Sequence, residues 1–385
     1  MRIVLFTHSL ASDWNHGNAH FLRGVARELR ARGHDVRAWE PAGAWSAANL
    51  VAEAGDAALA GWLAAYPALA DVRHVYDPAD LEGALDRALD GADLVLMHEW
   101  NEHALVAAAG RRRAGGGRFK LLFHDTHHRS VTDPASMAAY DLSAYDGVLA
   151  FGEAVRQVYL RNAWAERAWT WHEAADERVF RPMPNEPREG DLVWVGNWGD
   201  EERTEELREF LLAPVRDLGL RARVHGVRYP DYARQELADA GIEYAGWLPN
   251  YRAPETFARF GVTVHVPRRP YVRALPGVPT IRVFEALACG IPLVSAPWDD
   301  AEGLFTPGAD FLFAANGDEM RRRLRDVLGD PALAASLAAH GRETILARHT
   351  CGHRADELLA VARALGVDPA PAAAPAGRRL TGTPA

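Results

Sequence analysis

The sequence is poor in cysteine, has no excess of basic residues and contains no long hydrophobic run. Only two of its 385 residues are cysteines, Cys289 and Cys351, and neither has a partner at metal or redox spacing. A disulfide scaffold and a zinc module are therefore excluded, and a reducing cytoplasm is expected. The 43 Lys and Arg residues are outnumbered by 52 Asp and Glu residues, which gives a net charge of -9. Because this sign disfavours broad nucleic-acid binding, we expect no nucleic-acid partner.

The hydrophobic stretches are too short for a membrane-spanning helix. The most apolar one, residues 57–70, contains Gly61 and Pro67 and falls short of the roughly 20 residues that such a helix needs. Residues 1–6 are mostly apolar, but polar residues follow at once, unlike the long apolar region of a signal peptide. We therefore expect a cytoplasmic protein without a membrane span, and peripheral association with a membrane stays open.

Short apolar runs alternate with segments of helical periodicity along most of the chain. Residues 2–6 are typical of a buried parallel strand, and residues 18–32 have apolar side chains at helical spacing. The alternation predicts further strands at residues 34–39, 92–97, 119–123, 147–151, 168–171, 191–196, 221–226, 261–266 and 292–295. It predicts helices at residues 103–112, 153–161, 201–218, 280–288 and within 317–365. This alternation is typical of doubly wound parallel sheets, so the predicted fold class is α/β.

The chain is too long for one ordinary hydrophobic core, and its composition changes near the middle. Three prolines, Asn185 and Gly190 crowd into residues 182–190, which favours a linker. We predict a first Rossmann-like domain at residues 1–182, a linker at 183–190 and a second Rossmann-like domain at 191–345. Further helices are predicted at 346–366, with packing back on the first domain left open. The Ala- and Pro-rich residues 367–385 are predicted to be disordered.

Ligands of open parallel sheets bind beyond the carboxyl ends of the strands, so the residues after each predicted strand are candidates for a site. A turn at residues 196–199 leads into a helix whose free N–H groups suit a diphosphate. It matches neither a Walker loop nor a three-glycine dinucleotide fingerprint. Arg268, Arg269 and Arg273 follow another strand, and a basic cluster in an acidic protein favours an anionic partner. A plain turn and surface arginines are the simpler alternatives.

Two loops that contain histidine follow neighbouring strands of the first half. Residues 98–101 and 124–129 are expected to open on the same cleft. A metal site is one interpretation of the clustered His and Asp side chains. No second ligand set stands at a defined spacing, so we predict that no metal binds. Acceptor binding or proton transfer through His124 or Asp125 is another interpretation, and hydrogen-bonded loop histidines are the simplest.

The most specific stretch is residues 279–295, which combine an acid near the start of a predicted helix, a small-residue helix end and an apolar strand. Together with residues 301–310, it resembles the donor-binding domain of GT-B glycosyltransferases, in particular the CgeB-like branch of the family 1 and family 4 group. The resemblance implies two Rossmann-like domains that face each other across a cleft. It also implies that Glu285 holds hydroxyls of the donor sugar, as the first of two glutamates eight residues apart. Leu293 stands where the second would be, and Glu302 is a substitute from the next loop.

The resemblance assigns roles to further residues of both halves. The residues that it places at the donor phosphates, at the leaving diphosphate and at the nucleobase are Gly196, Asn197, Arg203, Arg268, Arg282, Trp247 and Leu248. On the acceptor side, Asp13 and His16 follow the first strand and are candidates to accept the proton of the acceptor hydroxyl. The simpler alternatives are a helix cap for Glu285, core packing for Trp247, and an exposed His16 beside a capping Asn15 or Asn18.

These inferences predict an enzyme that transfers a sugar from a nucleoside diphosphate sugar to a hydroxyl or similar nucleophile of a small-molecule or glycan acceptor. The resemblance implies catalysis without a metal or other cofactor, and with retention of the anomeric configuration. A GT-B epimerase of nucleotide sugars and a non-catalytic sugar-nucleotide or glycan-binding protein are the alternatives. Conversion of free nucleotide sugar without an acceptor would indicate the epimerase, and donor binding without turnover would indicate the binding protein.

Overall fold

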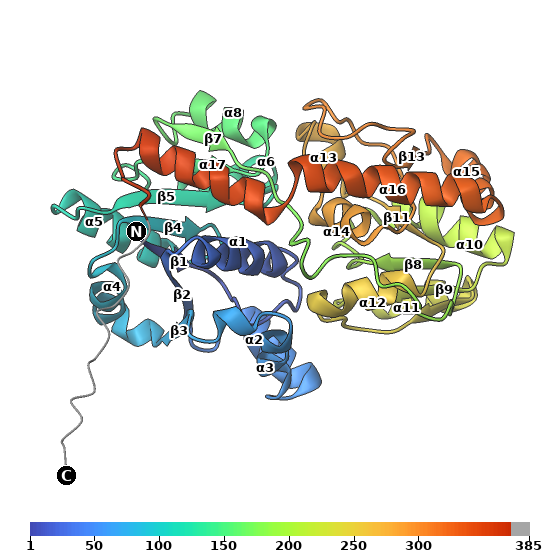
Figure 1. Ribbon diagram of the computed structural model, residues 1–385, viewed down its shortest axis with the longest axis horizontal. Helices are drawn as coiled ribbons and strands as arrows, with labels where there is room; N and C mark the ends of the chain where they lie inside the picture. Colours follow the sequence, from blue (N-terminus) through green and yellow to red (C-terminus); the bar gives the residue numbers. More distant parts are fainter. Residues whose placement is uncertain (371–385) are drawn as a thin grey trace, which may run out of the picture.

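A computed structural model describes residues 1–370, which form two parallel β-sheets flanked by helices (Figure 1). The first sheet has seven strands in the order β3-β2-β1-β4-β5-β6-β7. They are β1 (Arg2–Phe6), β2 (Asp35–Pro41), β3 (Arg73–Tyr76), β4 (Leu94–His98), β5 (Lys120–Asp125), β6 (Gly147–Ala150) and β7 (Ala168–Thr170). The helices of this half are α1 (Ala19–Ala31), α2 (Trp45–Ala54), α3 (Ala58–Gly61), α4 (Leu81–Leu89), α5 (His103–Ala114), α6 (Arg129–Thr132), α7 (Pro134–Ala138) and α8 (Glu153–Arg161).

The second sheet has six strands in the order β10-β9-β8-β11-β12-β13. They are β8 (Leu192–Val195), β9 (Ala222–His225), β10 (Ile242–Tyr244), β11 (Val262–His265), β12 (Leu293–Ser295) and β13 (Leu312–Phe313). The helices that follow β8 are α9 (Thr204–Leu207), α10 (Ala213–Leu218), α11 (Asp231–Asp239), α12 (Ala253–Ala258), α13 (Arg269–Ala274), α14 (Ile281–Cys289), α15 (Gly317–Gly329), α16 (Pro331–Arg348) and α17 (Cys351–Ala364). The strands pair in parallel in both sheets, which confirms the predicted fold class.

Several elements differ from those predicted from the sequence pattern. The strands β3, β10 and β13 lie at sheet edges and have four, three and two residues, which is too short for a recognisable period. The helix predicted at residues 201–218 is two α-helices separated by a π-helical turn at Arg208–Leu212. The disorder predicted for residues 367–385 concerns a segment of which residues 371–385 lie outside the described part of the chain.

Helix α14 shows how local sequence places a residue between the domains. It begins after Thr280 and ends at Gly290, whose φ of 68° is a left-handed conformation that glycine adopts without strain. Every residue of α14 except Arg282 is buried. Apolar side chains cover almost the whole surface of this helix, so it packs in the interior. Arg282 is thereby the one side chain of α14 that is partly exposed.

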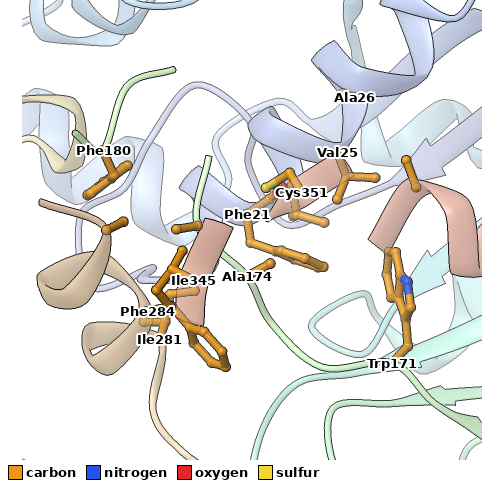
Figure 2. Packing of buried hydrophobic residues seen from close by; sticks show 14 of the residues in the cluster. Phe21, Val25, Ala26, Trp171, Ala174, Phe180, Ile281, Phe284, Ile345 and Cys351 are labelled. Atoms are coloured by element: carbon orange, nitrogen blue, oxygen red, sulfur yellow. Dashed lines mark hydrogen bonds between the residues drawn. The ribbon is translucent and has the colours of Figure 1, made fainter. Parts of the chain in front are cut away.

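One hydrophobic cluster runs through both halves of the molecule (Figure 2). Phe21 of α1 lies beside Cys351 of α17, and Phe284 of α14 lies near Ile345 of α16. Trp171, after β7, donates from Nε1 to a backbone oxygen of α17 at 2.9 Å. Because α17 packs on α1, the end of the chain returns to the first half. Burial of this shared apolar surface stabilises the relative position of the two sheets.

The strand order reverses once in each sheet, between β1 and β4 and between β8 and β11. In open parallel sheets, the loops that follow the strands on either side of such a reversal separate and leave a crevice. Both reversals are flanked by the loops that carry many of the sequence-predicted site residues. The topology therefore places these loops beside a crevice in each of the two sheets.

Candidate active site

A cavity of about 960 Å³ lies between the two halves of the molecule. Its lining includes the loops that follow β1, β4, β8 and β11, the strands that flank the two reversals of strand order. His16 and Trp100 line it from the first half, and Asn197 and Arg268 line it from the second. A crevice of this size with converging polar groups is where an open α/β fold binds a ligand. We take this cavity as the candidate active site.

The turn after β8 lies against neighbouring backbone. The hydroxyl of Tyr229 donates to the backbone oxygen of Gly196 at 2.7 Å. A Cβ at Gly226 would lie 2.1 Å from that same oxygen, so only glycine leaves room there. The nitrogen of Gly196 also donates to the backbone oxygen of His225 at 2.8 Å, so both polar backbone groups of Gly196 are engaged and hold the turn in place at the edge of the cavity.

Asn197 connects the turn to both sides of the cavity. Its Nδ2 donates to Oδ1 of Asn15, which belongs to the first half, and its Oδ1 accepts from the backbone nitrogen of Val227 at 2.9 Å. The amide side chain thus joins the turn to the first half through Asn15 and to a neighbouring loop of the second half through Val227. The backbone oxygen of Asn197 accepts from Arg203, which leaves the backbone N–H of this residue for contact with a donor.

Arg203 is a buried cation beside the same turn. It donates to the backbone oxygens of Asn197 at 2.6 Å and Val266 at 2.8 Å, and its guanidinium lies 5.0 Å from the ring centroid of Trp194. Burial, reinforced by the charge of Arg268, lowers the pKa of Arg203 to about 9, so the side chain still carries its charge at neutral pH. Its Nε has no hydrogen-bond partner among the described residues. Arg203 is therefore fixed by backbone oxygens, and no carboxylate of residues 1–370 pairs with it.

Arg268 lies on the loop after β11 and also lines the cavity. Its NH1 group donates to Glu202 at 2.9 Å, and the same carboxylate oxygen of Glu202 lies 3.3 Å from Nε2 of His128 in the first half. Glu202 thus joins the two halves at the cavity edge. The other two arginines of this sequence segment, Arg269 and Arg273, do not line the cavity.

Arg282 and Glu285 form an ion pair on α14. Arg282 lines the cavity, whereas Glu285 is completely buried and lies behind Arg282, with Oε1 2.8 Å from Nδ1 of His20. Burial alone would raise the pKa of Glu285, but the charges of Arg282 and His20 hold it below its usual value. The helix-cap alternative is wrong, because Glu285 lies inside α14 and Thr280 is the N-cap. Contact of Glu285 with the donor sugar stays a prediction.

Trp247 and Leu248 line the cavity from the loop after β10. The indole Nε1 of Trp247 donates to Oδ1 of Asp13 at 3.1 Å, so this side chain contacts the first half. Oδ2 of Asp13 accepts from Arg23 at 3.0 Å and from the backbone nitrogen of Asn250 at 3.2 Å. Asp13 also lines the cavity, but its carboxylate is occupied by three donors. The structure places it as a contact between the halves, and its role as a proton acceptor stays a prediction.

Glu302 and Leu293 lie away from the cavity lining. Leu293 is buried in β12. The carboxylate of Glu302 accepts from the backbone nitrogen of Glu153 at 2.9 Å and lies 2.8 Å from Nε2 of His172. Both partners belong to the first half, so Glu302 contributes a further contact between the halves. Its predicted contact with the donor remains untested.

His16 belongs to a row of four histidine rings that leads from the cavity into the first sheet. Its ring centroid lies 5.6 Å from that of His8 and 6.0 Å from that of His98, which lies 5.3 Å from that of His124. Burial, followed by the charge of His8, lowers the pKa of His16 well below its usual value. The ring is therefore neutral at pH 7, with a lone pair on one nitrogen, although it is a weaker base than free imidazole. The alternative of an exposed His16 beside a capping Asn18 is wrong, because His16 is 5% exposed and Asn18 makes no side-chain cap.

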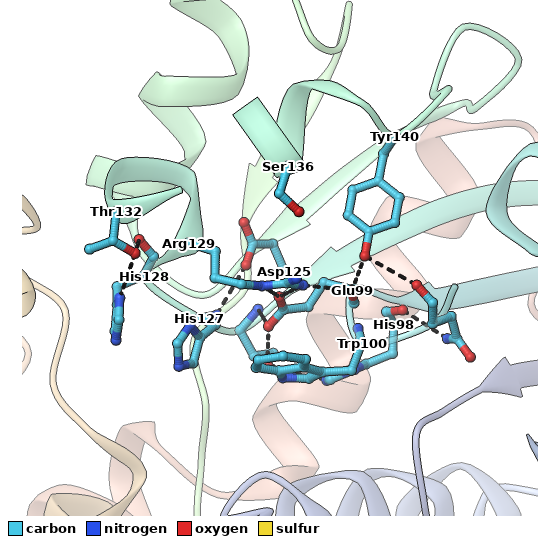
Figure 3. A network of polar contacts seen from close by, with 12 residues as sticks. His98, Glu99, Trp100, Asp125, His127, His128, Arg129, Thr132, Ser136 and Tyr140 are labelled. Atoms are coloured by element: carbon cyan, nitrogen blue, oxygen red, sulfur yellow. Dashed lines mark hydrogen bonds and ion pairs between the residues drawn. The ribbon is translucent and has the colours of Figure 1, made fainter. Parts of the chain in front are cut away.

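His124 and Asp125 are the last two residues of strand β5, and Figure 3 shows Asp125 within a network of polar contacts. Both are buried, and neither lines the cavity. Asp125 accepts from the Tyr159 hydroxyl at 2.8 Å and from the backbone nitrogen of His127 at 3.0 Å. Burial, with a further contribution from the nearby Glu99, raises the pKa of Asp125 to about 8. The cavity is instead lined by the next residues of this loop, so proton transfer through His124 or Asp125 stays a prediction.

Glu173 is a candidate that sequence reasoning did not place in the site. It lies in the crossover between the two halves, lines the cavity and is 6% exposed. Its Oε1 accepts from the side-chain amide of Asn18 at 2.6 Å. Burial, with a smaller contribution from the negative charge of Glu285, raises the pKa of Glu173 to about 8. Its place after the last predicted strand of the first domain was the only available sequence signal.

Among residues 1–370, no group of three His, Cys, Asp or Glu side chains is arranged to hold a metal ion. None of the helices in this part of the chain combines the length and apolar character needed to cross a membrane. Metal-independent catalysis stays a prediction.

Comparisons with known proteins agree with this geometry. Residues 203–360 match a family model described as glycosyl transferase-like. A comparison with curated proteins gave no match. This family match covers most of the second half, including Arg203, Arg268 and α14.

Solved structures of glycosyltransferases have the same two-domain fold. Sucrose-phosphate synthase from Thermosynechococcus elongatus has a TM-score of 0.65 at 15% identity, covering 95% of this chain and 99% of that one. HepE from Anabaena, in complex with UDP and glucose, has a TM-score of 0.67 at 14% identity, covering 94% and 100%. An alpha-glucosyltransferase in complex with UDP and a 13-mer DNA has a TM-score of 0.66 at 10% identity, covering 94% and 99%. The predicted GT-B fold is confirmed, and the family match supports the predicted glycosyltransferase class.

Proposed function

We propose that the protein transfers a sugar from a nucleoside diphosphate sugar to an acceptor hydroxyl, with the donor bound by the second half and the acceptor by the first. The observation that carries this proposal is that Arg203, Arg268 and Arg282 line the same cavity as the turn at residues 196–197. We call these three arginines and this turn the cationic wall. Every arginine that lines the cavity within the described chain comes from the second half. That half is therefore suited to an anionic ligand.

The cationic wall accounts for binding and activation of the donor diphosphate. Charge-assisted hydrogen bonds from Arg268 and Arg282 would hold its oxygens, and backbone groups of the turn would fix its orientation. Negative charge grows on the diphosphate as its bond to the sugar breaks, and fixed cations stabilise that charge. Arg203 adds positive charge that is not paired with a carboxylate in the described part of the chain. Trp247 and Leu248 would contact the nucleobase at the far end of this wall.

Glu285 acts in this proposal as a positioning residue. Its carboxylate pairs with Arg282 and faces His20 on the other side, so it fixes where the Arg282 guanidinium stands in the cavity. A direct contact of Glu285 with sugar hydroxyls would require Arg282 to move. The arrangement therefore supports an effect of Glu285 through Arg282.

His16 is the proton acceptor that the geometry supports best among the predicted candidates. It lines the cavity, its imidazole is neutral, and its Nε2 has no hydrogen-bond partner among the described residues. The carboxylate of Asp13 is engaged by three donors, and His124 and Asp125 lie behind the wall. The acceptor hydroxyl would give its proton to His16 as the new bond to the sugar forms.

We further propose that this transfer needs no metal ion or other cofactor and takes place in the cytoplasm. Three arginines supply the positive charge that a divalent cation provides in other diphosphate sites. The near absence of cysteine supports the reducing compartment. Retention of the anomeric configuration is supported by the resemblance of residues 279–295 to retaining enzymes.

A thermal-shift panel tests the proposal with a matched pair of variants. The protein would be heated with UDP-, GDP-, TDP- and ADP-sugars as wild type, Arg268→Met and Arg273→Met. We expect one nucleotide to raise the melting temperature of the wild type and Arg273→Met, and to have a much smaller effect on Arg268→Met. Arg273 is the control because it is exposed on the same segment and outside the cavity. No shift with any nucleotide, or equal shifts in both variants, would overturn the donor site.

The reaction itself separates transfer from the alternatives. Release of nucleoside diphosphate that depends on an added acceptor indicates transfer. Conversion of the free nucleotide sugar without an acceptor would indicate an epimerase, and nucleotide binding without either reaction would indicate a binding protein.

A further inference from the structure

The first-half side of the cavity contains a group of aromatic and aliphatic side chains. Trp45, Tyr76, Leu81, Trp100 and Leu105 line it, and we call these five residues the aromatic wall. Trp45 is 48% exposed and Trp100 is 42% exposed, the two most exposed tryptophans among the large apolar residues of the described chain. Large aromatic surface left in contact with water at the edge of a cavity marks a binding surface.

The two exposed tryptophans are held in fixed orientations. The ring centroid of Trp45 lies 5.1 Å from that of Trp14 in an edge-to-face contact, and Trp14 donates from Nε1 to Glu53 at 2.5 Å. The ring centroid of Trp100 lies 5.1 Å from that of His127, again edge to face. A rigid aromatic surface loses little conformational entropy when a ligand binds, so both rings are preorganised for contact.

This wall offers almost no charge to a ligand. No arginine or lysine of the first half lines the cavity in the described chain. The guanidinium of Arg129 lies 4.2 Å from the Trp100 ring centroid, but it is paired with the buried Glu99 at 2.6 Å (Figure 3). Burial raises the pKa of Tyr76 to about 12, so its hydroxyl stays neutral. Glu102 is the one acidic side chain beside these residues in the described lining, and its charge repels anions.

We propose that the aromatic wall binds an uncharged acceptor whose hydroxyl is attached to an aromatic or other hydrophobic ring. This inference rests on the proposed glycosyl transfer and names its acceptor class. Burial of a flat apolar ring against Trp45 and Trp100 removes the exposed aromatic surface from water. Arg228 of the second half lies 5.9 Å from the Trp45 ring centroid, but it is paired with Asp200 at 2.9 Å, so a nucleic acid or phosphorylated acceptor would have to compete with that carboxylate. A glycan would leave hydroxyls without partners on Leu81 and Leu105.

With this acceptor, the transfer step exchanges one bond of the anomeric carbon for another. The ring hydroxyl oxygen forms a bond to the anomeric carbon of the donor sugar. The bond between that carbon and the diphosphate oxygen breaks, and its electron pair leaves with the diphosphate. The hydroxyl proton passes to His16. The products are a hydrophobic O-glycoside and a nucleoside diphosphate.

Calorimetric titration of the full chain tests the inference with three probes: 2-naphthol, maltotriose and a short oligodeoxythymidylate. We expect saturable binding of 2-naphthol that weakens at least fivefold in Trp45→Ala and in Trp100→Ala. The control is Leu346→Ala, which removes an apolar side chain 38% exposed on α16, outside the cavity, and is expected to bind 2-naphthol as the wild type does. Both tryptophans are exposed, so their replacement is expected to leave the fold intact.

The possible results separate this inference from the proposed function. Tighter binding of maltotriose or of the oligonucleotide than of 2-naphthol would overturn the acceptor class. So would absence of saturable 2-naphthol binding, or equal binding in the wild type and both tryptophan variants. The nucleotide thermal shift is measured on the same preparations, and it is expected to be unchanged in Trp45→Ala and Trp100→Ala. If no nucleotide shifts the melting temperature of the wild type, the donor site is contradicted. The acceptor class is still tested in that case by the relative affinities of the three probes.

Discussion

The two walls of the cavity are built on similar parallel sheets, yet their side chains differ sharply in charge. The cationic wall follows β8 and β11 and carries Arg203 and Arg268, with Arg282 reaching the same space from α14. The aromatic wall lies across the first half, where no arginine or lysine of the described chain reaches the cavity. Strand order thus places the loops of Arg203, Arg268 and Trp100 beside the reversal points, whereas Trp45 and Tyr76 belong to the β2–β3 side of the first sheet. From the different side-chain chemistry of the two walls we expect each to bind a different ligand.

The contacts that join the walls are polar and lie at the edges of the cavity. Asn15 accepts from Asn197, Asp13 accepts from Trp247, and His128 faces Glu202. Behind them, the shared apolar cluster of α1, α14 and α17 holds the halves together. We therefore expect that the proposed donor and acceptor sides can be altered separately, as long as these contacts are kept.

The largest expected effect comes from crowding the cationic wall through its backbone. In Gly226→Ala, the new Cβ would lie 2.1 Å from Gly196 O and displace the turn. We expect nucleotide affinity to fall about 100-fold or more and the free energy of unfolding to fall by about 1–3 kcal/mol. Gly329→Ala is the control, because a Cβ there meets no atom within 4 Å. Unchanged nucleotide affinity in Gly226→Ala, measured by calorimetry, would separate the turn from donor binding.

A smaller loss of activity is expected from Glu285→Gln. Without the carboxylate, Arg282 loses its ion-pair partner and the contact that fixes its position, so turnover is expected to fall about 10- to 100-fold. The matched control is Glu206→Gln. In the wild type the Glu206 carboxylate accepts from Arg269 at 2.8 Å outside the cavity, so turnover of this variant is expected to stay within about twofold of the wild type.

Turnover per folded molecule and melting temperature would be measured on one preparation of each variant. If Glu285→Gln melts lower but turns over like the wild type, Glu285 has a structural role only. A loss of turnover in both variants would mean that turnover depends on ion pairs of the second half in general, and not on Glu285 specifically.

The smallest expected effect concerns Glu173, between the walls. Burial raises the pKa of Glu173 to about 8, from an ordinary value of 4.5. Between these values the unfolded chain has released the proton that the folded protein retains, so this group lowers the stability of the wild type as the pH rises from about 5 to 8. Glu173→Gln cannot ionise and is expected to lack this fall, with a difference of about 1–3 kcal/mol at pH 8.

Melting temperatures at pH 5 and pH 8 check this expectation. The control is Glu343→Gln, an exposed side chain of α16, whose profile should follow that of the wild type. Parallel profiles for Glu173→Gln and the wild type would show that Glu173 is already ionised in the folded protein.

Much of the fold could be predicted because long buried strands and amphipathic helices have strong periodic signals. β1, α1, β5 and α8 were predicted close to their observed bounds. The edge strand β3 was missed because its four residues are partly exposed and mix charged with apolar side chains. The helix after β8 was predicted as one piece, because the π-helical turn at Arg208–Leu212 leaves the apolar pattern continuous.

The site was predictable at the level of loops and less so at the level of side chains. The sequence indicated the loops after β1, β5 and β8, because their place at strand ends follows from the topology. Which residue of a loop or helix reaches the cavity depends on packing between distant segments. Glu285 therefore lies behind Arg282, while Glu173 enters the cavity from a crossover that has no periodic pattern.

One calorimetric comparison tests the central claim that the two walls bind different ligands. The dissociation constant of the preferred nucleoside diphosphate would be measured for the wild type, Arg268→Met and Trp100→Ala. Loss of a charge-assisted contact from the cationic wall is expected to weaken binding about tenfold in Arg268→Met, whereas Trp100→Ala should stay within about twofold of the wild type. Equal weakening in both variants, or weakening in Trp100→Ala alone, would contradict the separation of donor and acceptor sides.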